Sequence, residues 1–144
     1  MKTENYPSWL VPIEIAKSLK EIGFNKSTQN TTSSDILESK RYKEENKIYS
    51  QNYILKESSY NANSTEGGIS IPTWEQVFEW FRSKNILGLV ECQCNPEIEY
   101  FTRIIIDGVN YYMKGERKSY KSYEECRKVL VEKLIEIYET NINI

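Results

Sequence analysis

The stretch "EIEYFTRIIIDGVNYYM", residues 97–113, carries the strongest fold signal in the chain. Two runs rich in apolar and aromatic residues flank the dipeptide Asp107-Gly108, and Asp-Gly between two such runs is typical of a two-residue hairpin turn. A third run, "GLVECQCN" (88–95), precedes it and is separated from it by Asn95-Pro96. These three runs predict a three-stranded antiparallel meander.

The alternation of side chains along a strand assigns each residue of the middle run to one face of the sheet. The face that Ile104 occupies is expected to carry Tyr100, Thr102, Ile104 and Ile106, and the opposite face Phe101, Arg103 and Ile105. In the first run, Val90, Cys92 and Cys94 are expected to share one side.

Just before the meander, "PTWEQVFEWFRSK" (72–84) has the pattern of a capped amphipathic helix. Thr73 and Gln76 have the spacing of a capping box, which predicts a helix from about Trp74 to Ser83 or Lys84. At helical spacing one face forms the expected core, and Trp80 falls on its flank as a candidate for contact. The expected core residues are Trp74, Val77, Phe78 and Phe81.

Two further helices are predicted, one near each end of the chain. The first runs from about Pro12 to Ile22 and ends at Gly23, a residue typical of helix C-termini. The second runs from about Tyr123 to Glu139 behind the N-cap Ser122, with a buried face of Cys126, Leu130, Leu134 and Ile137. The sequence therefore predicts an α+β fold, a three- to five-stranded antiparallel β-meander packed by three helices in the order α-β-α-β-β-β-α.

Residues 25–68 form a polar segment within an expected single domain of residues 1–144. Runs dense in Asn, Ser and Thr predict loops at 25–35 and 57–68, because such side chains offer the backbone local hydrogen bonds. Between them, one strand at about 47–57 is expected, and a short helix through 34–46 stays open as an alternative.

Composition narrows the function classes. Nineteen Lys and Arg against 21 Asp and Glu give a formal charge of -2, so bulk charge does not recruit duplex nucleic acid. No apolar run is long enough for a membrane span or a secretory leader, and we expect a cytoplasmic protein.

The chain contains no histidine, which removes the commonest general acid-base residue. We therefore expect a binding protein, with no catalytic residues and no cofactor.

Three cysteines, Cys92, Cys94 and Cys126, are expected to be reduced. A closed zinc site needs four ligands and usually a Cys-x2-4-Cys turn. We therefore interpret the thiols as buried small hydrophobes and expect no metal site.

One combination of aromatic and cationic residues indicates a ligand. Aromatic faces stack on bases, and Arg or Lys binds phosphate through charge-assisted hydrogen bonds. The candidate ligand-binding residues are Trp80, Arg82, Arg103, Tyr112, Lys114 and Arg117. The simpler explanation, that Tyr and Lys alternate because one sheet face is wet, stays open.

Three stretches, "VPIEIAKSLKEIGF", "IPTWEQVFEWFRSK" and "YKSYEECRKVLVEKLIEIYE", together resemble a set of small proteins from phages and prophages of gut bacteria. The resemblance covers most of the chain outside residues 25–68 and implies a viral accessory protein, with no site residues to carry over. Joined to the aromatic and cationic residues, it suggests a sponge that sequesters a nucleotide-type immune signalling molecule, with a site often formed between subunits of a homo-oligomer. The alternative is a protein-protein inhibitor of a host factor or a phage assembly factor.

Overall fold

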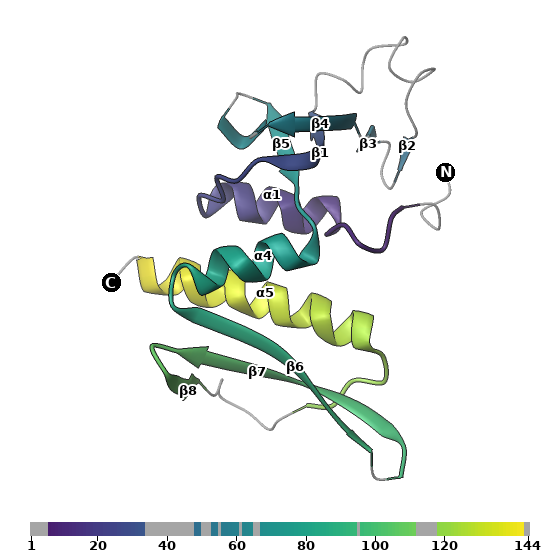
Figure 1. Ribbon diagram of the computed structural model, residues 1–144, viewed down its shortest axis with the longest axis vertical. Coiled ribbons are helices and arrows are strands. Elements are labelled where there is room, and N and C mark those ends of the chain that lie inside the picture. The colour runs from purple at the N-terminus through teal and green to yellow at the C-terminus, as the bar shows by residue number, and fades with distance from the viewer. Residues whose placement is uncertain are drawn as a thin grey trace. The chain divides into compact units, whose positions relative to one another are not determined.

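The computed structural model describes residues 6–33, 48–49, 53–54, 56–60, 62–64, 67–94, 96–111 and 118–142. The chain divides into two compact units, Met1–Gln76 and Val77–Ile144, and each is described by itself (Figure 1). Helices and antiparallel sheets make up both units, which confirms the α+β class. The prediction of a single folding domain stays a prediction.

Helix α1 of the first unit, Ile13–Glu21, lies where the sequence predicts a helix. Its end forms a Schellman motif. The Phe24 N–H donates to the Leu19 carbonyl at 2.9 Å and the Gly23 N–H to the Lys20 carbonyl at 3.1 Å. Gly23 has a φ of 98°, a conformation that glycine adopts without the Cβ penalty of other residues, so the predicted glycine stop is confirmed.

The polar segment contains more regular structure than the sequence predicts. The loops expected at 25–35 and 57–68 are wrong in part, and the single strand expected at 47–57 is replaced by shorter ones. The helix considered for 34–46 lies outside the described residues. The elements are β1 (Thr28–Ser33), β2 (Ile48–Tyr49), β3 (Tyr53–Ile54), β4 (Lys56–Tyr60), the 3₁₀ turn η2 (Ala62–Ser64) and β5 (Gly68–Ile71).

A three-stranded antiparallel sheet of order β4-β1-β5 explains this difference. Thr28 and Thr31 of β1 are buried at 2% exposure each, and threonine is a favourable strand residue once a sheet covers it. The Asn63 side chain accepts from the Ser70 N–H at 2.9 Å and donates to the Phe24 carbonyl at 2.9 Å. Here polar side chains support the sheet instead of competing with it.

Helix α4, Trp74–Arg82, begins with the predicted capping box. The Gln76 N–H donates to the Thr73 hydroxyl at 3.2 Å, and the Gln76 side-chain oxygen accepts from the Thr73 N–H at 2.9 Å. The Trp74 indole N–H donates to the Ser8 carbonyl at 2.9 Å. All three hydrogen bonds lie within the first unit and fix the start of the helix.

The second unit contains the predicted meander, formed by β6 (Ile86–Cys94), β7 (Ile98–Ile106) and β8 (Val109–Tyr111) in the order β6-β7-β8. Ile106 pairs with Val109 across the β7–β8 turn. Asp107 and Gly108 between them have φ values of 51° and 81°, as the two central residues of a type I′ turn require. The hairpin expected from Asp-Gly is confirmed.

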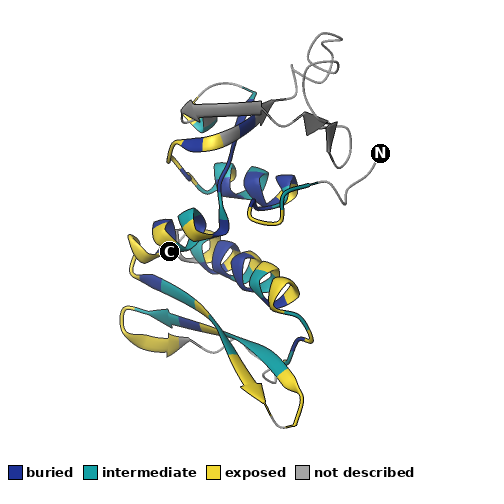
Figure 2. Ribbon diagram, turned by 45° about the vertical axis from the view of Figure 1, so that its right-hand side comes forward, coloured by how far each residue is buried: buried dark blue, intermediate teal, exposed yellow. Residues whose placement is uncertain are grey.

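Helix α5, Tyr123–Ile142, packs on one face of this sheet, against β6 and β7. The Glu125 N–H donates to the Ser122 hydroxyl at 3.1 Å, which confirms the predicted N-cap. The helix buries one side and exposes the other (Figure 2). The buried residues are Cys126, Leu130, Val131, Leu134, Ile135 and Ile137.

Gly88 in β6 sets how closely α5 approaches the sheet. A Cβ at this position would lie 2.8 Å from Cδ1 of Leu134 and 3.4 Å from Cδ1 of Leu130. Both leucines are fully buried, so neither side chain can move aside into solvent. The two leucines therefore occupy space that any other residue at position 88 would fill.

We predict that Gly88→Ala lowers the free energy of unfolding by about 1–3 kcal/mol, because the added methyl overpacks the contact with Leu134. Chemical denaturation measures the change. In a Leu134→Ala background the same substitution should cost much less, since the methyl then fills vacated space. An equal cost in the two backgrounds would show that Leu134 does not set the constraint.

Candidate functional site

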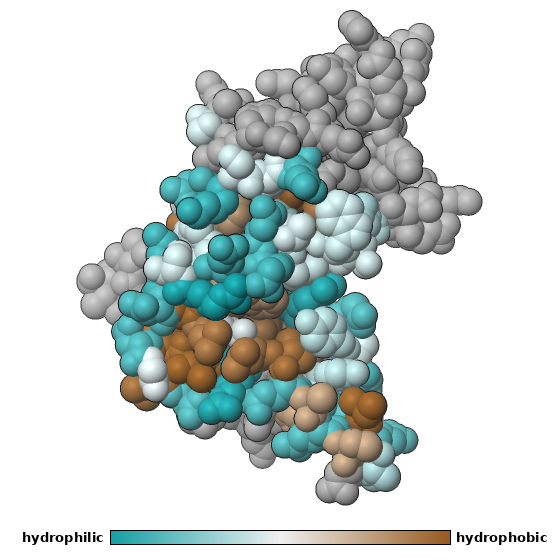
Figure 3. Space-filling model, viewed as in Figure 1, coloured by the Kyte–Doolittle hydropathy of each residue, from teal (hydrophilic) through white to brown (hydrophobic). Residues whose placement is uncertain are grey.

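The sheet of the second unit presents an outer face on the side opposite α5. Pairing sets Leu87 beside Ile105, Leu89 beside Arg103 and Glu91 beside Phe101, and the positions between them, such as Gly88, face the helix. Helix α5 packs against β6 and β7 on the opposite, inner face. Figure 3 shows apolar side chains gathered over the start of β6 and the end of β7, and Leu89 keeps 37% of its surface exposed.

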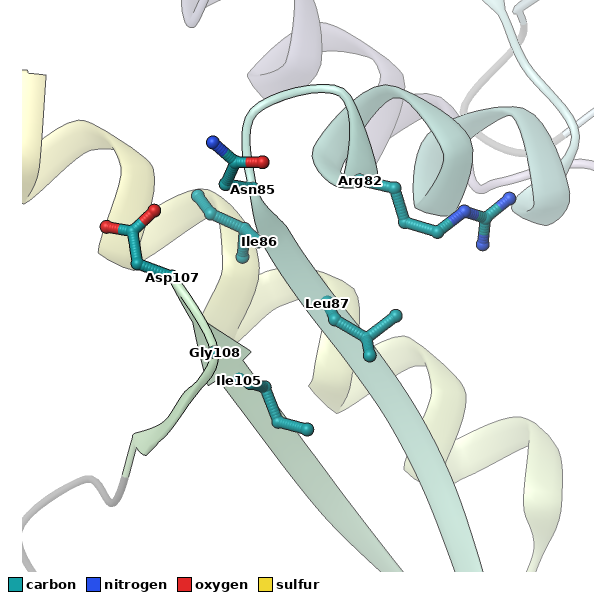
Figure 4. Close-up of a pocket in the computed structure, with 7 residues that line it drawn as sticks. All are labelled: Arg82, Asn85, Ile86, Leu87, Ile105, Asp107 and Gly108. Carbon is teal, nitrogen blue, oxygen red and sulfur yellow. The ribbon is translucent and has the colours of Figure 1, made fainter.

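A pocket of about 490 Å³ lies at the end of this face, where β6 begins and β7 turns into β8 (Figure 4). Leu87 and Ile105, paired across the two strands, provide its apolar part. Asn85, Asp107 and the Gly108 backbone provide polar groups around it. The lining residues are Arg82, Asn85, Ile86, Leu87, Ile105, Asp107 and Gly108.

Two residues with left-handed backbone form the rim of the pocket. Asn85 has a φ of 61° and Asp107 a φ of 51°, and Asn and Asp tolerate this conformation better than other non-glycine residues. The Asp107 N–H donates to the Asn85 carbonyl at 3.1 Å. This hydrogen bond ties the turn after α4 to the β7–β8 turn and fixes the width of the rim.

Arg82 is the last residue of α4 and is exposed. The helix closes beside it through hydrogen bonds from the Lys84 N–H to the Phe81 carbonyl at 2.9 Å and from the Asn85 N–H to the Arg82 carbonyl at 3.0 Å. Figure 4 shows the Arg82 side chain extending outward on the side of β6 to which Leu87 also points. The pocket therefore has a guanidinium group at its edge.

Arg103 lies on the same outer face, two residues before Ile105. Its Nε donates to the Asn110 side-chain oxygen at 3.1 Å and lies 3.9 Å from a Glu91 carboxylate oxygen. Arg103 and Glu91 are both solvent-accessible, and an accessible ion pair contributes little to stability. These contacts hold the guanidinium over the outer face without burying its charge.

Of the predicted site residues, Arg82 lies at the edge of the pocket and Arg103 on the outer face of the sheet, outside the pocket lining. Tyr112, Lys114 and Arg117 lie outside the described residues. Sequence analysis did not select the other lining residues as site candidates, although the sequence contains a signal for two of them. Leu87 alternates with Leu89 on the face opposite Gly88, and Asp107 belongs to the hairpin turn.

The expected position of Trp80 on an exposed flank is wrong. Trp80 is only 3% exposed, whereas Phe78, expected in the core, is half-buried. The Trp80 ring lies 5.1 Å from the ring of Phe81 and 5.2 Å from that of Tyr138 on α5, centroid to centroid. Contact with Tyr138 makes Trp80 a core residue with no open ring face for stacking on a ligand.

We predict that Trp80→Ala lowers the free energy of unfolding by about 3–5 kcal/mol, as truncation of a buried aromatic does. Arg82→Ala serves as the surface control and should change it by less than about 0.5 kcal/mol. Denaturant titrations of the two variants measure the difference. A well-folded Trp80→Ala protein of unchanged stability would contradict the packing described here.

The expectation of buried thiols is correct only for Cys126. Cys92 and Cys94 are exposed, because the far ends of β6 and β7 extend beyond the first residue of α5 (Figure 1). Burial raises the pKa of the Cys126 thiol, Lys133 opposes this shift and Glu125 adds to it. Cys126 is therefore held as a neutral packing group, and the thiolate is the reactive form of cysteine.

Thiol labelling checks this division. In the folded protein at neutral pH we expect Cys92 and Cys94 to react with an alkylating reagent, and Cys126 to react only after denaturation. Peptide mass spectrometry identifies the labelled positions. Labelling of Cys126 at the rate of the other two under native conditions would contradict its burial.

No protein-family model, curated protein or solved structure matches the chain. Across the residues that the structure describes, no three His, Cys, Asp or Glu side chains come together as a metal site would require. Within the same residues, no helix combines the length and the apolar character needed to cross a bilayer.

Proposed function

We propose that this chain works by binding a small nucleotide-type molecule on the outer face of its second unit. The observation that carries the proposal is the pocket at Leu87 and Ile105, an apolar surface next to the exposed guanidinium group of Arg82. Sites for small molecules typically combine an apolar lining with a few polar groups that fix orientation.

Each part of the pocket matches one part of such a ligand. The Leu87 and Ile105 side chains offer an apolar surface for a flat ring, and Arg82 offers paired donors for a phosphate. The Asp107 carboxylate and the Asn85 amide can bond ring nitrogens or ribose hydroxyls. The carboxylate also disfavours a bare inorganic anion, so the ligand should carry both a phosphate and a neutral ring system.

The biological role proposed for this binding follows from the resemblance to small phage and prophage proteins. We infer a phage accessory protein that sequesters a nucleotide-type immune signalling molecule in the host cytoplasm and thereby counters anti-phage defence. Sequestration requires tight binding and no turnover, and a chain without histidine suits that role.

A second candidate is a protein-protein inhibitor or assembly factor. Large apolar side chains exposed in the second unit favour it, with Leu89 at 37%, Ile98 at 54% and Val109 at 69% exposure. An exposed large apolar side chain, such as Leu89 on the outer face, offers a partner protein an apolar contact. A pull-down with host proteins would then recover a partner, and that partner's binding would be lost on Leu89→Asp.

We predict that a cyclic dinucleotide or cyclic ADP-ribose-type ligand raises the melting temperature. Ligand at a hundredfold excess over its Kd should raise it by about 5–10 °C. Arg82→Gln should weaken binding by about ten- to a hundredfold, because one charge-assisted hydrogen bond is lost. Calorimetric titration measures the affinity directly.

The matched control for this experiment is Lys121→Gln. Lys121 is an exposed cation 3.7 Å from Glu97 and 4.0 Å from Glu99, and it does not line the pocket. Its substitution should leave ligand affinity unchanged. Equal loss in the two variants would indicate binding through overall charge, and no response to any nucleotide would leave the protein-contact function as the better candidate.

A further inference from the structure

Strand β6 forms one edge of the sheet in the second unit. In the described part of the chain its nine residues pair with β7 on one side and with no strand on the other. Helix α5 covers the inner face of the sheet, not its edge. A strand in this position presents a row of backbone donors and acceptors to an incoming strand.

The hydrogen bonds around the sheet identify which backbone groups point out of this edge. Tyr100 exchanges two backbone hydrogen bonds with Tyr120, of 2.9 Å and 2.8 Å, on the β8 side of β7. In an antiparallel ladder consecutive residues alternate in direction, so odd-numbered residues of β7 bond to β6. The Asp107 N–H bonded to the Asn85 carbonyl agrees with this alternation. The register then pairs these odd-numbered residues of β7 with odd-numbered residues of β6. The groups left on the open edge belong to Ile86, Gly88, Val90, Cys92 and Cys94.

The edge lacks the devices that usually prevent pairing. Natural edge strands are protected by Lys, Pro, bulges or short length. Strand β6 runs from Ile86 to Cys94 without Lys or Pro, and Glu91 is its one charged residue. Its register with β7 is unbroken along all nine positions. The strand is therefore long, regular and weakly charged.

We propose that a second copy of this chain pairs antiparallel along β6, with the two-fold axis at Val90, and joins the two sheets into one of six strands. Even-numbered residues must pair with even-numbered ones, because only these have outward backbone groups. A dyad at Val90, the central residue, pairs all nine positions. A dyad at Glu91 would set two like charges opposite each other, which is destabilising.

Charge at the ends of the paired strands favours the same arrangement. Lys84 precedes β6 and Glu97 follows it, and both lie outside the paired region. Antiparallel pairing brings Lys84 of one copy to the same end as Glu97 of the other, at both ends of the interface. Glu91, at the middle, faces Leu89 of the second copy and not another carboxylate.

This pairing also completes the border of the pocket. With the dyad at Val90, Gln93 of the second copy lies opposite Leu87, which lines the pocket. The second copy thus contributes an amide group next to Leu87, which with Ile105 forms the apolar floor of the pocket. The pairing itself rests on the edge of β6 and requires no ligand.

Cysteine cross-linking tests the register. Val90→Cys in a Cys92→Ser, Cys94→Ser background should give a disulfide-linked dimer on mild oxidation. The two copies of position 90 would have Cα atoms about 5.5 Å apart, within the range of disulfides. Gln93→Cys in the same background is the matched control, because its two copies would lie about 20 Å apart. Equal cross-linking by the two variants, or none by Val90→Cys, would overturn the register.

Sedimentation analysis without ligand tests the pairing itself. The unmodified protein should be a dimer, and Val90→Lys should be a monomer, because each copy would bring a charge to the dyad. Since Val90 lies on the face toward α5, a cooperative thermal transition of this variant checks that it is folded. Ile98→Lys, on the exposed end of β7, is the control and should stay dimeric. A monomeric unmodified protein, or a dimer that survives Val90→Lys, would overturn the proposal, whatever the outcome of the nucleotide experiments.

Discussion

The close approach of α5 to Gly88 is the constraint on which the second unit depends. A three-stranded sheet is too small to form a core by itself, and its stability comes from apolar area buried against a covering helix. Because position 88 has no side chain, Leu130 and Leu134 can reach the backbone of β6. The helix therefore covers the inner face and leaves the outer face, the pocket at its end and the edge of β6 uncovered by it.

Local signals in the sequence predicted much of the fold, because each acts through a few neighbouring residues. Asp107-Gly108 fixes a type I′ turn by its own backbone preference, and Gly23 and the Thr73–Gln76 box end and begin helices through hydrogen bonds a few residues long. Strand β1 could not be predicted in this way. Its Thr-rich sequence is compatible with a loop until β4 and β5, which lie far along the chain, pair with it.

The burial of Trp80 and the partial exposure of Phe78, both contrary to expectation, have the same cause. Residues 78 and 80 lie on different sides of the helical face, and periodicity alone places each near a boundary. Tyr138, more than fifty residues later, packs against Trp80 and thereby determines that Trp80 is buried. Among the candidate residues singled out from the sequence, Arg82 borders the pocket, but the pocket depends on the pairing of Leu87 with Ile105, which no local pattern specifies.

A sheet covered by one helix leaves its outer face and its edge open together. The proposed ligand site lies on the face, and the proposed dimer contact lies along the edge. If β6 pairs with a second copy, Gln93 of that copy stands beside the pocket floor at Leu87. A ligand that contacts this amide binds the dimer more tightly than the monomer, and by thermodynamic reciprocity it strengthens pairing by the same factor. Binding and association would then be linked through one residue, because the strand that forms the pocket floor is also the strand at the open edge.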